Sequence, residues 1–458
     1  MTTYAALVRE YESAAGVPES SMPAVDPGAN LAATLPVWAL SGGAVASWAA
    51  AADRRRIALG LTPLHSRLDP ARVAAAFQSD KLFRAGGAPV NAFAEFSGFF
   101  ESANGWLRTH ANYPHHRAAL LRALDLPDTA DRAALVARIG SLSAAVIEDR
   151  AAELGAIAVR VRTEDEWAAT APGRAAAAGP LVATTRRDDL GNIESVAAAT
   201  QMLPLLGVRV LDLTRVIAGP VATRALALLG ADVLRVDPPH LPEIEWQFLD
   251  TCQGKRSTLV DLRTRRPELQ ELLSNADVLI TGYRPGALKR AGLDASEIRP
   301  GIVHGRVSAW GEDGPWGDRR GFDSIVQAAS GISLIEGAQR NSAGAHAPGA
   351  LPAQALDHAS GYLLAAGVLD ALTAREVDGH GRDVRVALAR TGSWLLSAPG
   401  RTPDHPPAEP PSAACTSTHH GITTATPALA EYPDHPWPAS QYGTHAPTWT
   451  LRPAGFHP

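Results

Sequence analysis

The chain has 458 residues, of which 46% are apolar and 19% charged, and its formal net charge is -5. This length exceeds what one hydrophobic core usually organises, so we expect two or more domains, and the apolar content excludes disorder along most of the chain. The slightly acidic balance gives no reason to expect a nucleic acid as partner.

The number of cysteines and the length of the apolar stretches indicate the cellular compartment of the protein. Two cysteines, Cys252 and Cys415, cannot form a disulfide framework, which indicates a reducing compartment and predicts a cytoplasmic protein. The first twenty residues have no positive segment leading into an apolar one, so no secretory signal is expected. The longest apolar stretches, 44–52 and 362–372, are shorter than the roughly 20 residues of a membrane helix, so no span is predicted.

Residues 1–200 are predicted to be mostly helical. Alanine and leucine recur at helical spacing over 72–77, 117–124 and one long run, 132–154. The buried stripe of the long run is expected to contain Leu135, Ile139, Leu142 and Ile147. Residues 156–161 alternate as a strand does, and Thr163 with the acidic residues after it indicates a helix start. This half therefore contains a small α+β unit at most.

From Gly207 onward, short apolar strands alternate with helices. The expected strands are 208–213, 232–236, 257–262, 277–281 and 302–308, and the expected helices are 220–229, 267–275 and 285–291. This alternation predicts βαβ units in a parallel sheet with both faces covered, which is a doubly wound α/β domain. Beyond about Leu395 the pattern stops, and a tail rich in proline and histidine is expected to pack over another domain.

Sheets of this kind bind ligands beyond the carboxyl ends of their strands. The segments after Leu213, Val236, Thr281 and Ser308 are therefore where we expect a site. The first strand is not followed by G-x-G-x-x-G, so no dinucleotide is indicated.

Asp357 stands at the start of an apolar helix that is expected to run to about Glu376 and to stop near Gly379. One interpretation is a helix cap, in which the carboxylate accepts hydrogen bonds from free backbone N–H groups. The other is a nucleophile: a carboxylate kept ionised by the helix dipole can attack a thioester carbonyl. The local sequence does not choose between them.

Basic residues gather in the predicted loops, where together they could bind phosphate groups. They are Arg215, Lys255, Arg256, Arg263, Arg284, Arg290, Arg319 and Arg320. His110, His115 and His116 lie close together near Tyr113, but their spacing does not make a zinc pattern, so no metal is predicted. A serine hydrolase is not supported either, because the G-x-S-x-G motif is missing.

Several motifs follow one another in a fixed order. Residues 206–239 read LGVRVLDLTRVIAGPVATRALALLGADVLRVDPP, and QGKRSTLVDLR, ADVLITGYRPGALKRAGL and SAWGEDGPW with RRGFDSIVQAASG follow before Asp357. Together they resemble the family III coenzyme A (CoA) transferases of the CaiB/BaiF type, a group that includes formyl-CoA transferase and α-methylacyl-CoA racemase. The resemblance implies a Rossmann-like CoA-binding domain, acyl-CoA and a small carboxylic acid as substrates, and Asp357 as the covalent nucleophile.

Further positions are carried over from the motifs as CoA contacts. They are Ile217, Ala218, Val260, Asp261, Leu262, Arg263, Gly282, Tyr283, Arg284, Arg290, Arg320, Gly321 and Phe322. The chain departs from the family at Pro238, where family members often have an arginine.

The same resemblance distinguishes transfer from racemisation. The racemases have a histidine directly before the aspartate that corresponds to Asp323, whereas this chain has Phe322, which cannot move a proton. We therefore expect CoA transfer between an acyl-CoA thioester and a carboxylic acid, through an aspartyl anhydride and an aspartyl-CoA thioester on Asp357. The alternatives are an α-methylacyl-CoA racemase-like epimerase and a non-catalytic CoA-binding fusion protein.

The expected division is 1–200, 204–395 and 396–458. The first region resembles the small domain that family members carry after the large one, as a degenerate or rearranged copy. The second is the Rossmann-like catalytic domain, and the third is the packing tail. Because family members are interlocked homodimers, the resemblance also implies a possible homodimer.

Overall fold

A mixed seven-stranded sheet forms the centre of the protein. The computed structural model describes residues 4–191, 199–339 and 346–450. The strand order is β6-β14-β11-β10-β7-β8-β9; six strands run parallel, and β6 at one edge runs antiparallel to β14. Their bounds are β6 Ala183–Leu190, β7 Arg209–Leu213, β8 Asp232–Asp237, β9 Lys255–Leu259, β10 Val278–Thr281, β11 Val303–Ser308 and β14 His380–Ala387. The predicted mixed α/β class is confirmed.

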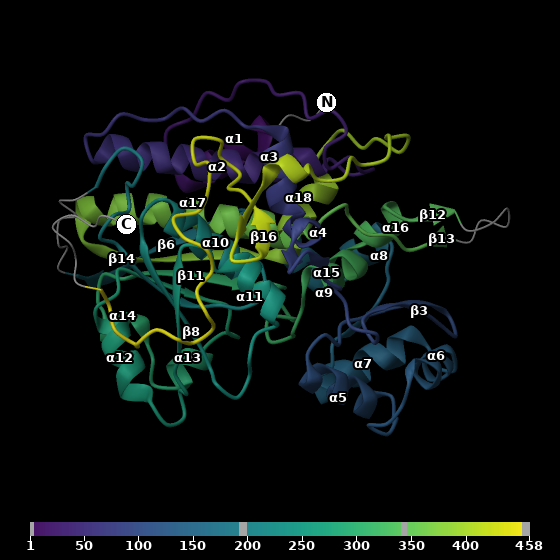
Figure 1. Cartoon of the computed structure of the whole chain (residues 1–458). Helices are drawn as coiled ribbons and strands as arrows, with labels where there is room; N and C mark the ends of the chain where they lie inside the picture. Colours follow the sequence, from purple (N-terminus) through teal and green to yellow (C-terminus); the bar gives the residue numbers. More distant parts are fainter. Residues whose placement is uncertain (1–3, 192–198, 340–345, 451–458) are drawn as a thin grey trace.

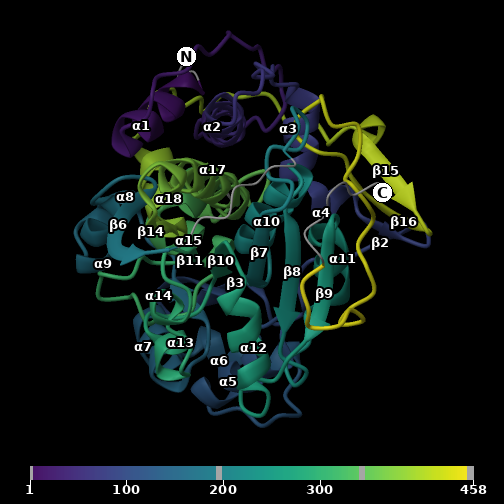
Figure 2. The ribbon, with the colours of Figure 1, turned by 90° about the vertical axis from the view of Figure 1, so that its left-hand side faces the viewer.

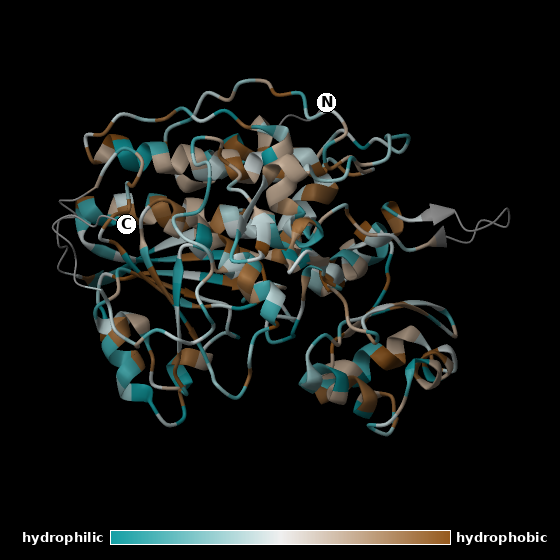
Figure 3. Cartoon of the chain, in the orientation of Figure 1, coloured by the Kyte–Doolittle hydropathy of each residue, from teal (hydrophilic) through white to brown (hydrophobic). Residues whose placement is uncertain are grey.

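Helices pack on both faces of this sheet (Figure 2). Alternate strand residues such as Val210 and Leu211 point to opposite faces, and both are fully buried. The first joins a core shared with α10 and α17, and the second joins a core shared with α12, α13 and α14. Apolar residues accordingly alternate over both faces of the central strands, as in β10, whose four residues are all buried (Figure 3). These helices are α10 Ala218–Leu228, α12 Arg266–Ser274, α13 Ala287–Arg290, α14 Ala295–Ile298 and α17 Ala355–Asp378.

The longest helix, α17, lies between the sheet and the N-terminal helices (Figure 1). It ends where the sequence predicts, because Gly379 takes a left-handed conformation (φ 73°). In this conformation the N–H of Gly379 donates to the carbonyl of Arg375. The N-terminal helix α2 crosses above it, and Arg54 of α2 donates to both carboxylate oxygens of Asp370 at 2.9 and 2.8 Å. The N-terminal helices are α1 Ala5–Ala15, α2 Val37–Ala58, α3 Pro70–Phe77 and α4 Ser79–Leu82.

A second compact unit has its own core, separate from the sheet (Figure 1). It consists of β3 Gly98–Ser102, β4 Gly105–Thr109, α5 Pro114–Ala123, α6 Arg132–Gly140, α7 Ala144–Leu154 and β5 Ala158–Arg160. The single long helix predicted over 132–154 is wrong: it divides after Gly140, and Ser143 caps the second helix by accepting from the N–H of Val146. Leu135, Ile139 and Ile147 are fully buried, whereas Leu142, between the helices, is half-buried.

The remaining elements connect these parts. The helix start at Thr163 is confirmed, since Thr163 and Glu166 form a reciprocal capping box. The bounds are β1 Arg84–Ala85, β2 Ala88–Pro89, α8 Glu164–Ala168, α9 Ala171–Ala177, α11 Glu245–Thr251, α15 Asp323–Ser330, α16 Ile332–Ile335, β12 Ala338–Gln339, β13 His346–Ala347, α18 Leu388–Ser397, η1 Ala413–Cys415, β15 Thr416–His419 and β16 Ile422–Ala425.

The C-terminal segment runs back over the rest of the chain. Its strand β16 pairs with β1, and its Trp449 indole donates to the carbonyl of Leu272 on α12 at 2.9 Å. The end of the expected tail, 451–458, lies outside the described residues. Among the described residues, no helix is both long and apolar enough to cross a membrane.

We expect Gly361→Ala to destabilise the protein, because Gly361 is the close contact between α17 and α10. An added Cβ would lie 2.6 Å from the carbonyl oxygen of Ala218 and 2.8 Å from Val221. Overpacking of this kind costs about 1–3 kcal/mol, more than the helix propensity gained. Urea unfolding checks this, with Gly140→Ala as the control, since an added Cβ there has its nearest neighbour at 3.9 Å. Equal stability of the two variants would contradict the close packing.

Candidate active site

The main candidate site is a cavity of about 350 Å3 at the carboxyl ends of the parallel strands. The segments after β7, β8, β10 and β11 all contribute to its wall, as expected for a parallel sheet. The loop after β7 is held tightly: Val216 has a left-handed backbone (φ 71°), which is unfavourable for a β-branched residue. Its N–H donates to Glu243 at 3.0 Å.

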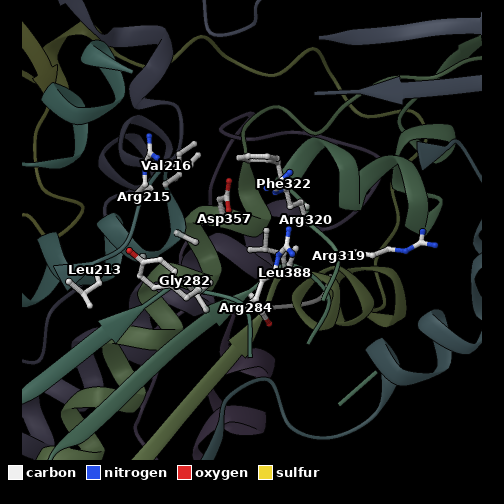
Figure 4. A pocket seen from close by; sticks show the side chains of 18 of the residues that line it. Leu213, Arg215, Val216, Gly282, Arg284, Arg319, Arg320, Phe322, Asp357 and Leu388 are labelled. Carbon is white, nitrogen blue, oxygen red and sulfur yellow. The ribbon is translucent and has the colours of Figure 1, made fainter. Parts of the chain in front are cut away.

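The cavity brings together nine of the fourteen residues carried over from the family motifs. They are Ile217, Ala218, Gly282, Tyr283, Arg284, Arg320, Gly321, Phe322 and Asp357 (Figure 4 shows several of them). Pro238, the departure from the family pattern, also lines it.

Five selected residues do not line this cavity: Val260, Asp261, Leu262, Arg263 and Arg290. Val260 is buried in the core beneath the sheet. Arg263 pairs with Asp261 at 2.8 Å, and Arg290 donates to the carbonyl of Pro285 at 3.3 Å. Their contact with CoA stays a prediction.

Asp357 is buried on the cavity wall, with 5% of the residue exposed. It is the third residue of α17, and its Oδ2 has no hydrogen-bond partner within the described part of the chain. The helix start is satisfied by a different carboxylate: Oδ2 of Asp323 accepts from the N–H of Leu356 at 2.8 Å and from that of Asp357 at 3.0 Å. Asp357 is therefore not the cap, and its carboxyl group is left free for chemistry.

Burial and the neighbouring Asp323 carboxylate raise the pKa of Asp357 well above its usual range. Burial also raises the pKa of Asp323. Asp323, however, accepts three hydrogen bonds, the third from the side chain of Gln327, and these favour its ionised form. The proton shared by this pair therefore resides on Asp357. This opposes the expectation that the helix dipole keeps Asp357 ionised.

The wall opposite the sheet comes from the second unit. Tyr113, His115 and His116 line the cavity, and the ring of His110 stacks on that of Phe322 with centroids 3.7 Å apart. Burial lowers the pKa of His110 to about 3 and that of His116 to about 2, so both rings are neutral near pH 7. The Nδ1 atoms of both rings are buried without a partner among the described residues.

A buried glutamate joins this wall to the sheet. Glu243 accepts a short hydrogen bond from the hydroxyl of Tyr113, and it also pairs with Arg235 at 3.0 Å and Arg215 at 3.5 Å. Arg215 lies over the ring of Tyr113 at 5.1 Å. One carboxylate thus holds the loop after β7 and the second unit together. Tyr113, His115 and His116 were not selected from the sequence as residues of this site. The only signal for them was the clustering of histidine and tyrosine over 113–116.

Metal ligands do not gather here. Across the described ranges, no group of three or more histidine, cysteine, aspartate or glutamate residues is placed to hold a metal ion. The charged groups near the cavity are instead guanidinium groups, from Arg215, Arg284, Arg319 and Arg320. Such a set suits anionic ligands.

Comparison with known proteins identifies the class of this region. Residues 205–421 match the family model described as CoA-transferase family III. The resemblance found in the sequence is thereby confirmed for this part of the chain.

Several known proteins are similar to part of this chain. An acetyl-coenzyme A transferase of Hypoxylon pulicicidum is 34% identical over 218 residues, covering 46% of this chain and 36% of the relative. A formyl-CoA:oxalate CoA-transferase of Streptomyces coelicolor is 34% identical over 200 residues, covering 40% and 47%. A CAIB/BAIF family crystal structure from Brucella suis is 28% identical, with a TM-score of 0.39, and the match covers 43% of this chain and 56% of that one. The chain thus spans about half or less of the curated relatives' length.

The carboxyl pair predicts opposite effects of two substitutions on stability. Because the pKa of Asp357 is higher in the folded state, the folded protein binds the extra proton, and its free energy of unfolding falls as pH rises from about 4 toward that raised pKa. Asp357→Asn removes this loss and should stabilise the protein at pH 7, with little gain below pH 4. Asp323→Ala leaves two buried N–H groups unpaired and should cost about 2 kcal/mol.

Thermal unfolding of both variants between pH 4 and 8 checks this prediction. A destabilised Asp357→Asn at pH 7, or a gain that does not change with pH, would contradict the raised pKa.

Proposed function

We propose that this chain is a CoA transferase that moves CoA between an acyl-CoA thioester and a carboxylic acid, with Asp357 as the nucleophile. The observation that carries this proposal is the buried Asp357 carboxyl group, which lines a cavity surrounded by guanidinium groups and whose Oδ2 has no partner among the described residues. The family III match over 205–421 supports it.

The first half-reaction forms two covalent intermediates. The ionised Asp357 attacks the thioester carbonyl carbon, the carbon–sulfur bond breaks, and CoA thiolate leaves a mixed anhydride. The thiolate then attacks the Asp357 carbonyl carbon, which releases the donor acid as a carboxylate and leaves an aspartyl-CoA thioester.

The acceptor carboxylate reverses these steps. It attacks the aspartyl thioester, a new anhydride forms, and the thiolate attacks the acyl carbonyl to give the new acyl-CoA and free Asp357. One thioester is exchanged for another, so no ATP is consumed. Because Asp357 must lose its proton to attack, kcat/KM should rise with pH until its raised pKa is passed.

Guanidinium groups would hold the anionic parts of CoA. Arg284 and Arg320 line the cavity beside Asp357 (Figure 4), and the backbone of Ile217 and Ala218 closes it at the start of α10. We propose that these residues contact CoA, and that the five motif residues outside the cavity also do so, because the family motifs place CoA contacts at these positions. The division into 1–200, 204–395 and 396–458, a homodimer and a cytoplasmic location are likewise proposals.

A second candidate is α-proton exchange on an acyl-CoA. The observation that favours it is His116, an imidazole from the second unit that lines the same cavity as Asp357. An acid and a base near the same substrate carbon could exchange its α-proton. Incorporation of deuterium at the α-carbon from deuterated water, without a second carboxylic acid, would identify this activity.

Asp357→Asn should abolish the covalent intermediate. After incubation with a panel of acyl-CoA thioesters, intact mass should show an adduct on the wild-type protein that hydroxylamine removes and that peptide mapping places at Asp357. The variant should form no adduct and should lose CoA exchange by at least about 1,000-fold. Asp313→Asn is the matched control, since that side chain is 90% exposed and lies off the cavity wall.

The outcomes separate the candidate functions. Full exchange by Asp357→Asn would refute the nucleophile. If CoA binds and no thioester gives an adduct, α-proton exchange or a non-catalytic CoA-binding role replaces transfer.

A further inference from the structure

A second cavity, of about 310 Å3, adjoins the site on the side of the second unit. One wall consists of the end of α7 and the start of β5, including Ala152, Ile157 and Val159. The other consists of the loop after β11 and of α15, including Trp310, Trp316 and Ile325. We call this space the tryptophan cavity. Its volume lies at the lower end of the roughly 300–1,000 Å3 that small-molecule sites occupy.

Three arginines form a boundary shared with the candidate active site. Arg284, Arg319 and Arg320 line both cavities. Arg319 lies over Trp316 at 4.4 Å and is 3.7 Å from Glu148. Arg320 donates to the carbonyl of Gly155 at 2.6 Å, which ties the boundary to the second unit.

Two of the cations at this boundary, Arg284 and Arg320, have no carboxylate partner among the described residues. The guanidinium of Arg284 makes no hydrogen bond or ion pair with any described residue. Burial, and after it the charge of Arg284, lowers the pKa of Arg320. Two guanidinium groups that repel each other form a favourable place for a carboxylate, which can bridge them. An anion entering here would also lie on the wall that contains Asp357 (Figure 4).

Beyond the arginines, the wall consists of apolar side chains packed against one another and of the exposed carboxylates of Glu153 and Asp318. The indoles of Trp310 and Trp316 meet edge to face at 4.7 Å, and Trp167 packs against both at 5.9 and 5.5 Å. Trp310 and Ile157 are buried beneath this surface. Aromatic faces held in this way favour an apolar ligand body over a polar one.

We propose that the tryptophan cavity holds the apolar body of the carboxylic acid substrate, whose carboxylate lies between the arginines and faces Asp357. This inference rests on the proposed function and names its substrate class: monocarboxylic acids with an aliphatic chain or an aryl group, in preference to oxalate and other short dicarboxylic acids. A short dicarboxylic acid would leave the indoles uncovered. Each methylene buried here should strengthen binding about fourfold until the cavity is full.

Filling the cavity tests the proposal. Ala152 is exposed at the end of α7 and lines the cavity, so Ala152→Phe should occupy the space without disturbing a core. Ala145→Phe is the matched control, because Ala145 is exposed on the same helix and lies off the cavity wall. Calorimetry would measure the binding of acetate and octanoate to each protein saturated with CoA, and CoA exchange with the same two acids would be followed in parallel.

The wild-type protein and Ala145→Phe should bind octanoate at least tenfold more tightly than acetate. Ala152→Phe should lose at least tenfold in octanoate affinity while CoA affinity is retained. Equal octanoate binding by both variants, or no preference for octanoate in the wild type, would overturn the inference. If octanoate binding is lost in Ala152→Phe while no acid supports exchange in any protein, the cavity assignment stands and the proposed transfer fails.

Discussion

A buried carboxylate, Asp323, holds the first turn of α17 and thereby determines the state of Asp357. Its Oδ2 accepts from two backbone N–H groups of that turn, which would otherwise be buried without partners. The two carboxyl groups consequently have different roles. Asp323 receives hydrogen bonds and is suited to remain ionised. The pKa of Asp357, whose Oδ2 receives none from the described residues, is raised.

The position of this turn depends on how α17 is packed. The helix lies between α2 and the parallel sheet, and at Gly361 it approaches α10, the helix that begins in the cavity wall. Asp357 is four residues earlier on the same helix. Since helix α17 is rigid and buried over most of its length, its packing fixes where the carboxyl group meets the cavity.

The other half of the site is an interface between units that are distant in the chain. The second unit contributes Tyr113 and His116 to the wall, and Glu243 ties Tyr113 to the strained loop at Val216. The same unit closes the tryptophan cavity against the loop after β11. Both cavities therefore depend on how this unit docks onto the sheet, and the arginines at their boundary are placed by that docking.

Local patterns in the chain were sufficient for much of the fold. Strands such as 208–213 and 277–281 could be predicted because both of their faces are apolar, and the end of α17 could be predicted because a glycine stops a helix. Asp357 was selected from ordered motifs. Strand β14 was not predicted, because its arginines and aspartate resemble a surface segment until β11 and β6 pair with it on either side. Which aspartate caps α17, and which histidines reach the cavity, depended on tertiary structure, because both are decided by contacts between residues far apart in the chain.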